Sequence, residues 1–240
     1  MSIAMFALVV TSGHSRSRRI ADVDLGQRSV TAREVPCESL AICLSRRLDQ
    51  GQAVRTGKRL NEERRASMGT PASFTCRETL RDGTAVEIRA LRPEDEAGML
   101  AALDQASMQT RQRRFFAPKR HFSDSERAYF MEIDFENHVA LVACAEDAGR
   151  NVIIGGGRYV VATPGSAEMA FVVVDAWQGR GVGRLLAQHL IALARESGLT
   201  ELTAEVMSDS TAMRRVFERL GFGPTSKRDP QTIHLALKLT

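Results

Sequence analysis

The clearest chemical signal in the sequence is the segment QGRGVG at residues 178–183, in which three glycines alternate with larger residues. It follows the apolar run 171–174 and precedes a leucine-rich stretch, so it lies between an expected strand and an expected helix. Successive backbone N–H groups in a tight turn form a concave anion site, and the following helix N-terminus adds about half a positive charge. Without a Cβ, glycines also let the backbone approach a pyrophosphate closely. This glycine turn predicts a site for a phosphorylated ligand, with Arg180 and Arg184 adding charge at its rim.

Three phosphate-binding patterns compete for the glycine turn. A P-loop ends in Gly-Lys-Ser/Thr, but an arginine follows Gly183, which excludes that pattern. A dinucleotide fingerprint G-x-G-x-x-G starting at Gly179 requires a glycine at position 184, where the arginine stands, and this weakens it. The third pattern, Q-x-x-G-x-G, has Gln178, Gly181 and Gly183 in place. We favour the third and keep a nucleotide-binding oxidoreductase as an alternative, which a failure to bind NAD(P) would remove.

The periodicity of apolar residues predicts the elements that must hold this turn. Alternation predicts strands, and spacings of three and four predict helices. The expected order is β-α-α-β-β-β-α-β-α-β, an α/β (α+β) arrangement over residues 71–240 with ample length for one core. The expected strands lie near 86–88 and at 138–144, 152–161 (interrupted by Gly155–Gly157), 167–174, 202–206 and 233–239, and the expected helices at about 93–103, 124–133, 184–197 and 210–220.

Local signals mark three of the helix starts. Pro93 stands at a first helical position with acids after it. Ser123 and Glu126 have the spacing of a capping box. Ser210, the last residue of Ser-Asp-Ser, is the expected cap of the final helix.

The basic charge of the chain is confined to its first part. Residues 1–70 hold 12 Lys and Arg against 7 Asp and Glu, whereas residues 71–240 hold 21 against 22. No nucleic-acid face is therefore expected on the second part. Residues 11–70 lack sustained periodicity apart from a short helix near 36–48, so residues 1–70 are expected to form a mostly disordered basic extension. A functional alternative is a basic tail that contacts nucleic acid or anionic surfaces. An alternative is that translation begins at Met68, just before the compact domain, which the intact mass of the native protein would decide.

Cysteines and histidines are too scattered to predict a metal site. The four cysteines form no C-x-x-C pair, and the five histidines form no H-x-x-x-H pair. The apolar run at residues 2–10 is too short for a membrane span and is followed rather than preceded by arginines, unlike a signal peptide. We therefore expect a cytoplasmic protein with reduced thiols and no membrane association.

From residue 75 onward, the sequence resembles a known family. Residues 168–222, with Q-x-x-G-x-G at 178–183 and VFERLGF at 216–222, resemble the acyl-CoA-binding half of the GNAT N-acetyltransferase superfamily. IRALRPED at 88–95, RFF at 114–116 and Ile133-Asp134 are similar to the acetyltransferase domain of bacterial Pat-type protein lysine acetyltransferases. The resemblance implies a mixed, splayed central sheet flanked by helices, with acetyl-CoA as co-substrate. It also implies a set of cofactor-binding residues: Val172, Val173, Val174, Gln178, Gly179, Arg180, Gly181, Val182, Gly183, Arg184 and Ser210.

The resemblance also implies a mechanism. The acceptor amine attacks the thioester directly, without a covalent enzyme intermediate. Glu168 matches the family's glutamate on the strand entering the site and is the candidate general base, while a solvent-exposed strand-end residue is its bland alternative. Strand alternation places its side chain on the face of Val172.

At several positions this sequence departs from the family pattern or leaves the role of a residue undecided. Many relatives have a tyrosine in the late helix as general acid, where this chain has Phe217, and many have an asparagine where this chain has Ser210. Trp177 is expected to anchor the core rather than cover the cofactor. Arg113, Arg114 and Phe116 either shape the acceptor side or form a solvated, structural cluster.

The functional expectation is an acetyl-CoA-dependent N-acetyltransferase acting on a protein lysine, with a small amine as the alternative acceptor. A non-catalytic acyl-CoA sensor is the alternative from another class. Neither the acyl chain preference nor the choice between monomer and dimer follows from the sequence.

Overall fold

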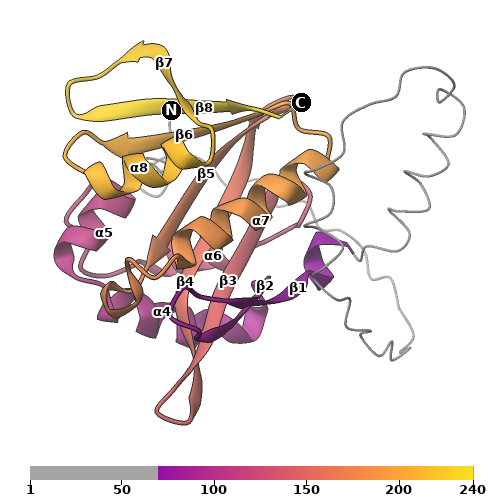
Figure 1. Ribbon diagram of the computed structural model, residues 1–240, viewed down its shortest axis with the longest axis vertical. Helices are drawn as coiled ribbons and strands as arrows, with labels where there is room; N and C mark the ends of the chain where they lie inside the picture. The colour runs from indigo at the N-terminus through magenta and orange to yellow at the C-terminus, as the bar shows by residue number, and fades with distance from the viewer. Residues whose placement is uncertain (1–69, 240) are drawn as a thin grey trace, which may run out of the picture.

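The computed structural model describes residues 70–239, which surround one eight-stranded mixed sheet (Figure 1). The strand order is β1-β2-β3-β4-β5-β6-β8-β7. The strands are β1 Thr75–Thr79, β2 Ala85–Ala90, β3 His138–Asp147, β4 Arg150–Thr163, β5 Ser166–Val173, β6 Glu201–Met207, β7 Gly223–Arg228 and β8 Thr232–Lys238. The predicted short helix near 36–48 and the proposed start at Met68 lie outside the described residues.

The sheet divides into two antiparallel parts joined by one short parallel pairing. Strands β1 to β5 pair antiparallel in chain order, and β6, β8 and β7 form the second antiparallel part. β5 and β6 are parallel and pair only through Ser166–Glu168 and Glu201–Thr203. Beyond these residues the two strands separate, which gives the splayed sheet that the family resemblance implies.

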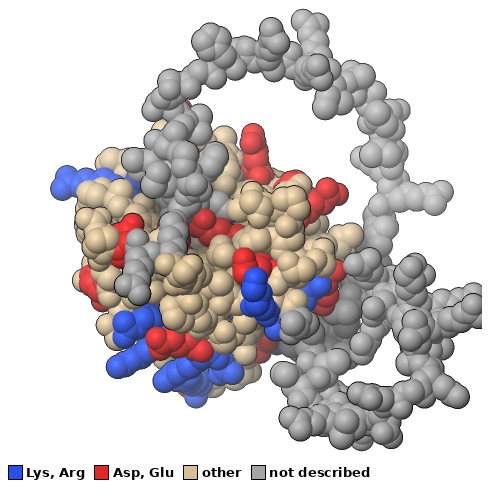
Figure 2. Space-filling view, turned by 90° about the horizontal axis from the view of Figure 1, so that it is seen from above, with Lys and Arg blue, Asp and Glu red and all other residues tan. Residues whose placement is uncertain are grey.

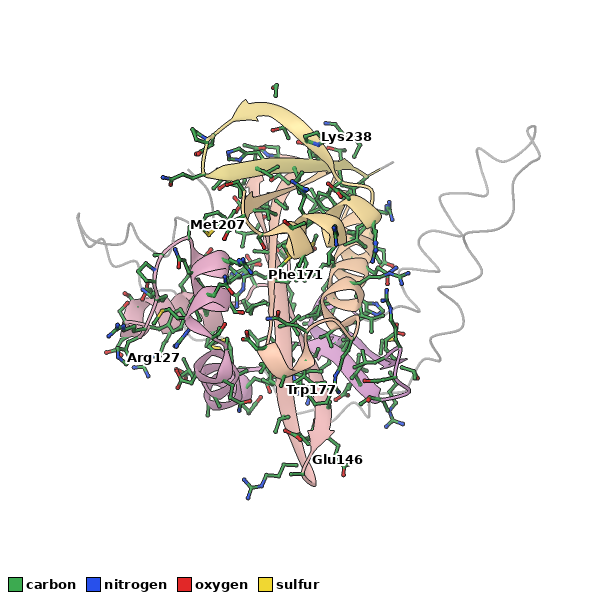
Figure 3. The ribbon with its side chains drawn as sticks, turned by 60° about the vertical axis from the view of Figure 1, so that its left-hand side comes forward. Arg127, Glu146, Phe171, Trp177, Met207 and Lys238 are labelled. Carbon is green, nitrogen blue, oxygen red and sulfur yellow. The ribbon has the colours of Figure 1, made fainter. Side chains whose placement is uncertain are left out.

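Helices cover both faces of the sheet (Figures 1 and 3). They are α4 Glu96–Gln105, α5 Met108–Phe115, α6 Asp124–Met131, α7 Val182–Glu196 and α8 Thr211–Arg219, with single 3-10 turns at Pro71–Ser73, Pro93–Asp95 and Asp175–Trp177. In Figure 3, α4, α5 and α6 lie on one side of β3 and β4, and α7 lies on the other. Among the described residues, no helix is long and apolar enough to cross a bilayer.

α7 supplies the centre of the hydrophobic core. Its apolar face, including the fully buried Leu186 and Leu190, packs against β3, β4 and β5. Gly157 of β4 allows this approach, because a Cβ there would lie 2.9 Å from Leu190 Cδ1. A Cβ at Gly155 would lie 2.9 Å from the Val172 carbonyl oxygen of the neighbouring strand β5 and 3.5 Å from Leu186 Cδ1. β4 runs through these glycines without a break, so the prediction that they interrupt the strand is wrong.

Most of the expected elements are present at about the expected bounds, and the capping box of α6 is formed by Ser123 and Glu126. Three elements were not predicted from the sequence: β1, β7 and α5. α5 is strongly polar, so apolar periodicity could not reveal it; its cap is Ser107, whose Oγ accepts from Thr110 N at 3.2 Å. Ser210 stands at the cap position of α8, but its side chain makes no capping hydrogen bond, which corrects the expected cap.

Charges of both signs are mixed on the face of the molecule shown in Figure 2. Lys and Arg lie beside Asp and Glu there, with uncharged surface between them. This mixture accords with the near balance of charge in residues 71–240.

Candidate active site

A large cleft opens where β5 and β6 separate. It has a volume of about 390 Å³. Its walls come from β5, the glycine turn, the start of α7, α5, the end of β6 and α8. Figure 3 shows Phe171 on β5 in the middle of the sheet. Trp177, in the 3-10 turn that follows β5, lies below it in the same view. A narrow, elongated ligand with a phosphorylated end would fit such a cleft.

Two glycines of the turn are required by the backbone conformation. Gly179 has φ 76° and Gly181 has φ 109°, values that residues with a Cβ adopt only under strain. A Cβ added at either position would meet no atom within 4 Å. Gly181 is also the residue that precedes α7, so the turn leads directly into the N-terminus of that helix. This is the arrangement that an anion requires.

Gly183 has a different reason for lacking a side chain. A Cβ there would lie 2.9 Å from an edge atom of the Phe171 ring. The third glycine of the turn therefore brings α7 close to β5, in addition to lining the cleft.

The cationic rim of the cleft differs from the rim that the sequence suggested. Arg184 lines the cleft, but Arg180 does not: its guanidinium lies 4.7 Å from the Trp177 ring centroid and 3.5 Å from Asp82. Trp177 is half-buried, packs against the core and lines the cleft. Further arginines reach the cleft from elements distant in sequence, and these were missed: Arg81 after β1, and Arg215 and Arg219 on α8.

The backbone of β5 presents alternate residues to the gap between the strands. The Ala167 carbonyl accepts from Thr203 Oγ1 of β6 at 3.4 Å, whereas the Val174 N–H donates to Ile154 of β4 at 3.0 Å. Because backbone groups alternate along a strand, the N–H and C=O groups of Phe171 and Val173 point to the gap. Those of Val172 and Val174 point to β4.

A hydrogen-bond network ties the glycine turn to α5. The Asp175 carboxylate accepts from Ser107 N at 2.8 Å, Ser107 Oγ at 2.8 Å and Thr110 Oγ1 at 3.0 Å. Gln178 Nε2 donates to Thr110 Oγ1 at 3.1 Å and to the Val173 carbonyl at 3.0 Å. The side-chain amide of Gln178 therefore has a structural part beside any contact with a ligand.

Glu168 lies where β5 and β6 part. It pairs with Val160 of β4 and with Thr203 of β6, and it is 8% exposed. Its side chain shares the face of Ala170 and Val172, and all three line the cleft. The alternative prediction, that Glu168 is a strand-end residue exposed to solvent, is wrong, because this residue is buried at the apex of the cleft.

Two arginines lie on the same face of the sheet as Glu168. Burial lowers the pKa of Arg114, on α5, to about 10, and the negative charge of Glu168 opposes that shift. Arg158 of β4 is 8% exposed and donates to the Phe130 carbonyl at 3.3 Å. Burial and the nearby Arg114 lower its pKa to about 9. Positive charge on this wall disfavours the protonated form of an amine that enters the cleft.

The far wall of the cleft carries the residues at which this chain departs from its expected relatives. Phe217 is 2% exposed, and its ring centroid lies 5.2 Å from that of Phe171 and 4.9 Å from that of Phe222. Ser210 is buried beside it and lines the cleft. The described residues that line the cleft include no cysteine, histidine or tyrosine. The described lining of the cleft therefore offers no thiol that could form a covalent intermediate and no tyrosine that could act as a general acid.

The cleft also contains the three residues whose role the sequence left open. Arg113, Arg114 and Phe116 all line it. Arg113 also forms an ion pair of 3.4 Å with Asp209, at the start of α8, which joins the two sides of the cleft.

Comparisons with known proteins agree with this geometry. Residues 105–222 match the acetyltransferase (GNAT) family. The chain is 33% identical over 162 residues to an acetyltransferase of Pseudomonas aeruginosa, covering 65% of this chain and 86% of that protein. It is 30% identical over 165 residues to acetyltransferase Pat of Mycolicibacterium smegmatis, covering 68% of this chain and 47% of Pat. The chain therefore spans about half the length of that relative.

Solved structures give the same result. The GNAT domain of S. lividans PAT superposes with a TM-score of 0.64 at 30% identity, covering 69% of this chain and 97% of that domain. The acetyltransferase yncA of Salmonella typhimurium, solved with its cofactor acetyl-CoA, shares the fold, with a TM-score of 0.54 at 21% identity over 65% of this chain and 94% of yncA.

Proposed function

The chain belongs to the GNAT family of acyl-CoA-dependent N-acetyltransferases, and on that premise we propose that it transfers an acetyl group from acetyl-CoA to the side-chain amine of a protein lysine. The observation that carries the proposal is the apex of the cleft, where Glu168 is buried at the point at which β5 leaves β6. The 30% identity to Pat and to the GNAT domain of S. lividans PAT supports a protein lysine as the acceptor.

The glycine turn would bind the pyrophosphate of coenzyme A. Backbone N–H groups of residues 179–183 and the N-terminus of α7 supply partial positive charge to it. Arg184 and Arg81 line the same cleft and can pair with phosphate oxygens. The pantetheine arm then lies between β5 and β6 and bonds the backbone of Phe171 and Val173, which faces the gap.

The chemistry is direct acyl transfer. The amine nitrogen attacks the thioester carbonyl, the new C–N bond forms, the C–S bond breaks, and the coenzyme A thiolate leaves. A lysine amine has an ordinary pKa of about 10.4, so few molecules are neutral at neutral pH. The charge of Arg114 disfavours the ammonium form, and Glu168 accepts the proton from the attacking nitrogen, directly or through water.

Solvent would protonate the leaving thiolate. The side chain of Phe217 has no proton to donate, and the described lining contains no tyrosine. Most of the rate enhancement then comes from holding the amine and the thioester together, which can supply about 7–11 kcal/mol of the barrier.

Identification of the acceptor is the experiment that tests the proposed function. The full-length protein is incubated with acetyl-CoA and separately with candidate proteins and a panel of small amines, and acetylated sites are mapped by mass spectrometry. Acetylated protein lysines that disappear with Glu168→Gln support the proposal. Turnover confined to small amines would move the substrate class to the alternative acceptor.

A non-catalytic sensor of acyl-CoA is the second candidate. It is favoured by Phe217, which occupies the position of the family's tyrosine and is part of the core. Tight binding of acetyl-CoA with no turnover on any amine would support it.

A further inference from the structure

A second cluster of reactive side chains lies away from the cleft, where edge strand β1 packs against α7. Cys76 and Glu78 are two residues apart on β1 and project from the same face of the strand. Cys76 is 7% exposed, and His189 of α7, which faces them, is also 7% exposed. The thiol sulfur, a carboxylate oxygen and an imidazole nitrogen all lie within 4.8 Å of one another, the one such group in residues 70–239.

The distances suit a tetrahedral ion. Glu78 Oε1 lies 2.9 Å from His189 Nε2, and Cys76 Sγ lies 3.8 Å from Glu78 Oε1. Zinc bonds of about 2.0–2.3 Å to O, N and S ligands imply separations of about 3.3–3.5 Å between the ligand atoms. The two separations to Glu78 are therefore within about half an ångström of the distances in a filled site, and the thiol and the imidazole lie within 4.8 Å of each other, so side-chain rotations can close the set.

The surroundings of His189 hold its imidazole toward β1. Its Nε2 lies 2.9 Å from Glu78 Oε1, and the residue is buried. The Phe74 ring, 5.2 Å from the imidazole centroid, forms an apolar wall on one side.

The thiol also donates to the Glu78 carboxylate at 3.8 Å and to the Arg77 carbonyl at 3.7 Å, so a thiol, a carboxylate and an imidazole converge on one point. A thiolate with an imidazole is a borderline-soft donor set, which suits Zn²⁺ and not Mg²⁺ or Ca²⁺. The Glu78 side chain is 24% exposed, so an ion can reach the cluster from solvent.

We infer that Cys76, Glu78 and His189 form a Zn²⁺ site that fastens β1 to α7, with water as the fourth ligand. Coordination replaces the thiol proton, which passes to solvent, and no oxidation is involved. The scattered spacing of cysteines and histidines hides such a site from the sequence, since Glu78 and His189 are 111 residues apart in the chain.

The test uses full-length protein that is reduced and stripped of metal. Titration with Co²⁺ should give a thiolate-to-cobalt charge-transfer band that saturates at a single equivalent and is abolished by competing Zn²⁺. The band should disappear in Cys76→Ser and persist in the matched variant Cys37→Ser/Cys43→Ser, which removes two thiols elsewhere. Absence of the band in the unmodified protein, or its persistence in Cys76→Ser, would overturn the inference.

Two further variants separate metal binding from folding. Glu78→Gln can still hydrogen-bond to His189, so it should keep the fold, which acetyl-CoA binding and circular dichroism check. It should weaken Zn²⁺ binding by at least about tenfold, because even outer partners of a site cost about 10–100-fold. His121→Asn, in an exposed loop, should leave Zn²⁺ binding unchanged. Equal Zn²⁺ affinity in the unmodified protein and Glu78→Gln would exclude the carboxylate ligand and the proposed site.

Discussion

Glu168 of β5 and Thr203 of β6 form the last rung of the parallel pairing, and beyond this pair the two strands separate. The candidate base therefore lies at the apex of the cleft, where a thioester inserted between the strands would end. Its role depends on this position: one rung earlier it would be enclosed by the sheet, and beyond the turn it would lie in solvent.

Glu168→Gln tests the candidate base by kinetics. It should lower kcat by about 10²–10⁴-fold, the usual contribution of a positioned general base, and leave the KM for acetyl-CoA within about threefold. The matched control is Glu146→Gln, the same change at an exposed end of β3, which should keep full activity. A loss confined to KM would show that Glu168 binds substrate and does not accept the proton.

The glycine turn predicts two different defects for two similar substitutions. Gly181→Ala, at φ 109°, introduces backbone strain of about 1–3 kcal/mol and should raise the Kd for acetyl-CoA by at least about tenfold. Gly183→Ala forces a Cβ against Phe171 and should lower stability by about 1–3 kcal/mol, measured by denaturant unfolding. Adding Phe171→Leu to Gly183→Ala should recover part of that loss. Equal losses of affinity for acetyl-CoA in the two alanine variants would contradict this division.

The structure predicts that Arg81, and not Arg180, contacts the phosphates of coenzyme A. Arg81→Ala should raise the Kd for coenzyme A by about 10–100-fold, since charge-assisted hydrogen bonds contribute about 1.5–3 kcal/mol. Arg180→Ala should change it by less than about threefold, because its guanidinium contacts Trp177 and Asp82 at the surface. Calorimetry at two salt concentrations measures both, and the reverse order of effects would restore Arg180 to the phosphate site.

Asp175 predicts a loss of stability in acid. Burial raises the pKa of this carboxyl, but hydrogen bonds from Ser107 and Thr110 outweigh burial and hold the pKa below its usual value. A depressed folded-state pKa contributes stability that is present above the unfolded value of about 3.9 and is lost as pH falls through the folded value. The stability difference between the native protein and Asp175→Asn should therefore be largest near neutral pH and shrink below about pH 4. A difference that is constant with pH would exclude the charge as its cause.

His138 should lower the free energy of unfolding as pH falls, over a pH range above the one in which Asp175 acts. Burial and the nearby Arg158 lower its pKa to about 4, so the folded protein keeps this imidazole neutral. The unfolded chain takes up the proton at about pH 6.5, so the unfolded state binds more protons between those values and stability falls as pH falls. His138→Gln should flatten the dependence of unfolding free energy on pH between about 6.5 and 4. An unchanged slope in that variant would show that other groups carry it.

Much of the candidate active site could be predicted from the sequence because its signals are local. The turn at residues 178–183 can be recognised from its closely spaced glycines. The face on which Glu168 lies follows from the alternation of a few consecutive residues. The strands other than β1 and β7, and the apolar helix α7, were visible for the same reason, since periodicity is a property of consecutive residues. The family resemblance likewise rests on short local segments, at 88–95, 114–116, 133–134 and 168–222.

Tertiary structure alone decided which distant residues meet. The polar helix α5 has no apolar period, and its position depends on Ser107 and Thr110 binding Asp175, 68 and 65 residues away. Only folding brings Arg81 to the cleft and places Cys76 and Glu78 against His189. Such contacts are set by the packing of whole elements and the closure of long loops, and nothing in the spacing of a sequence records them.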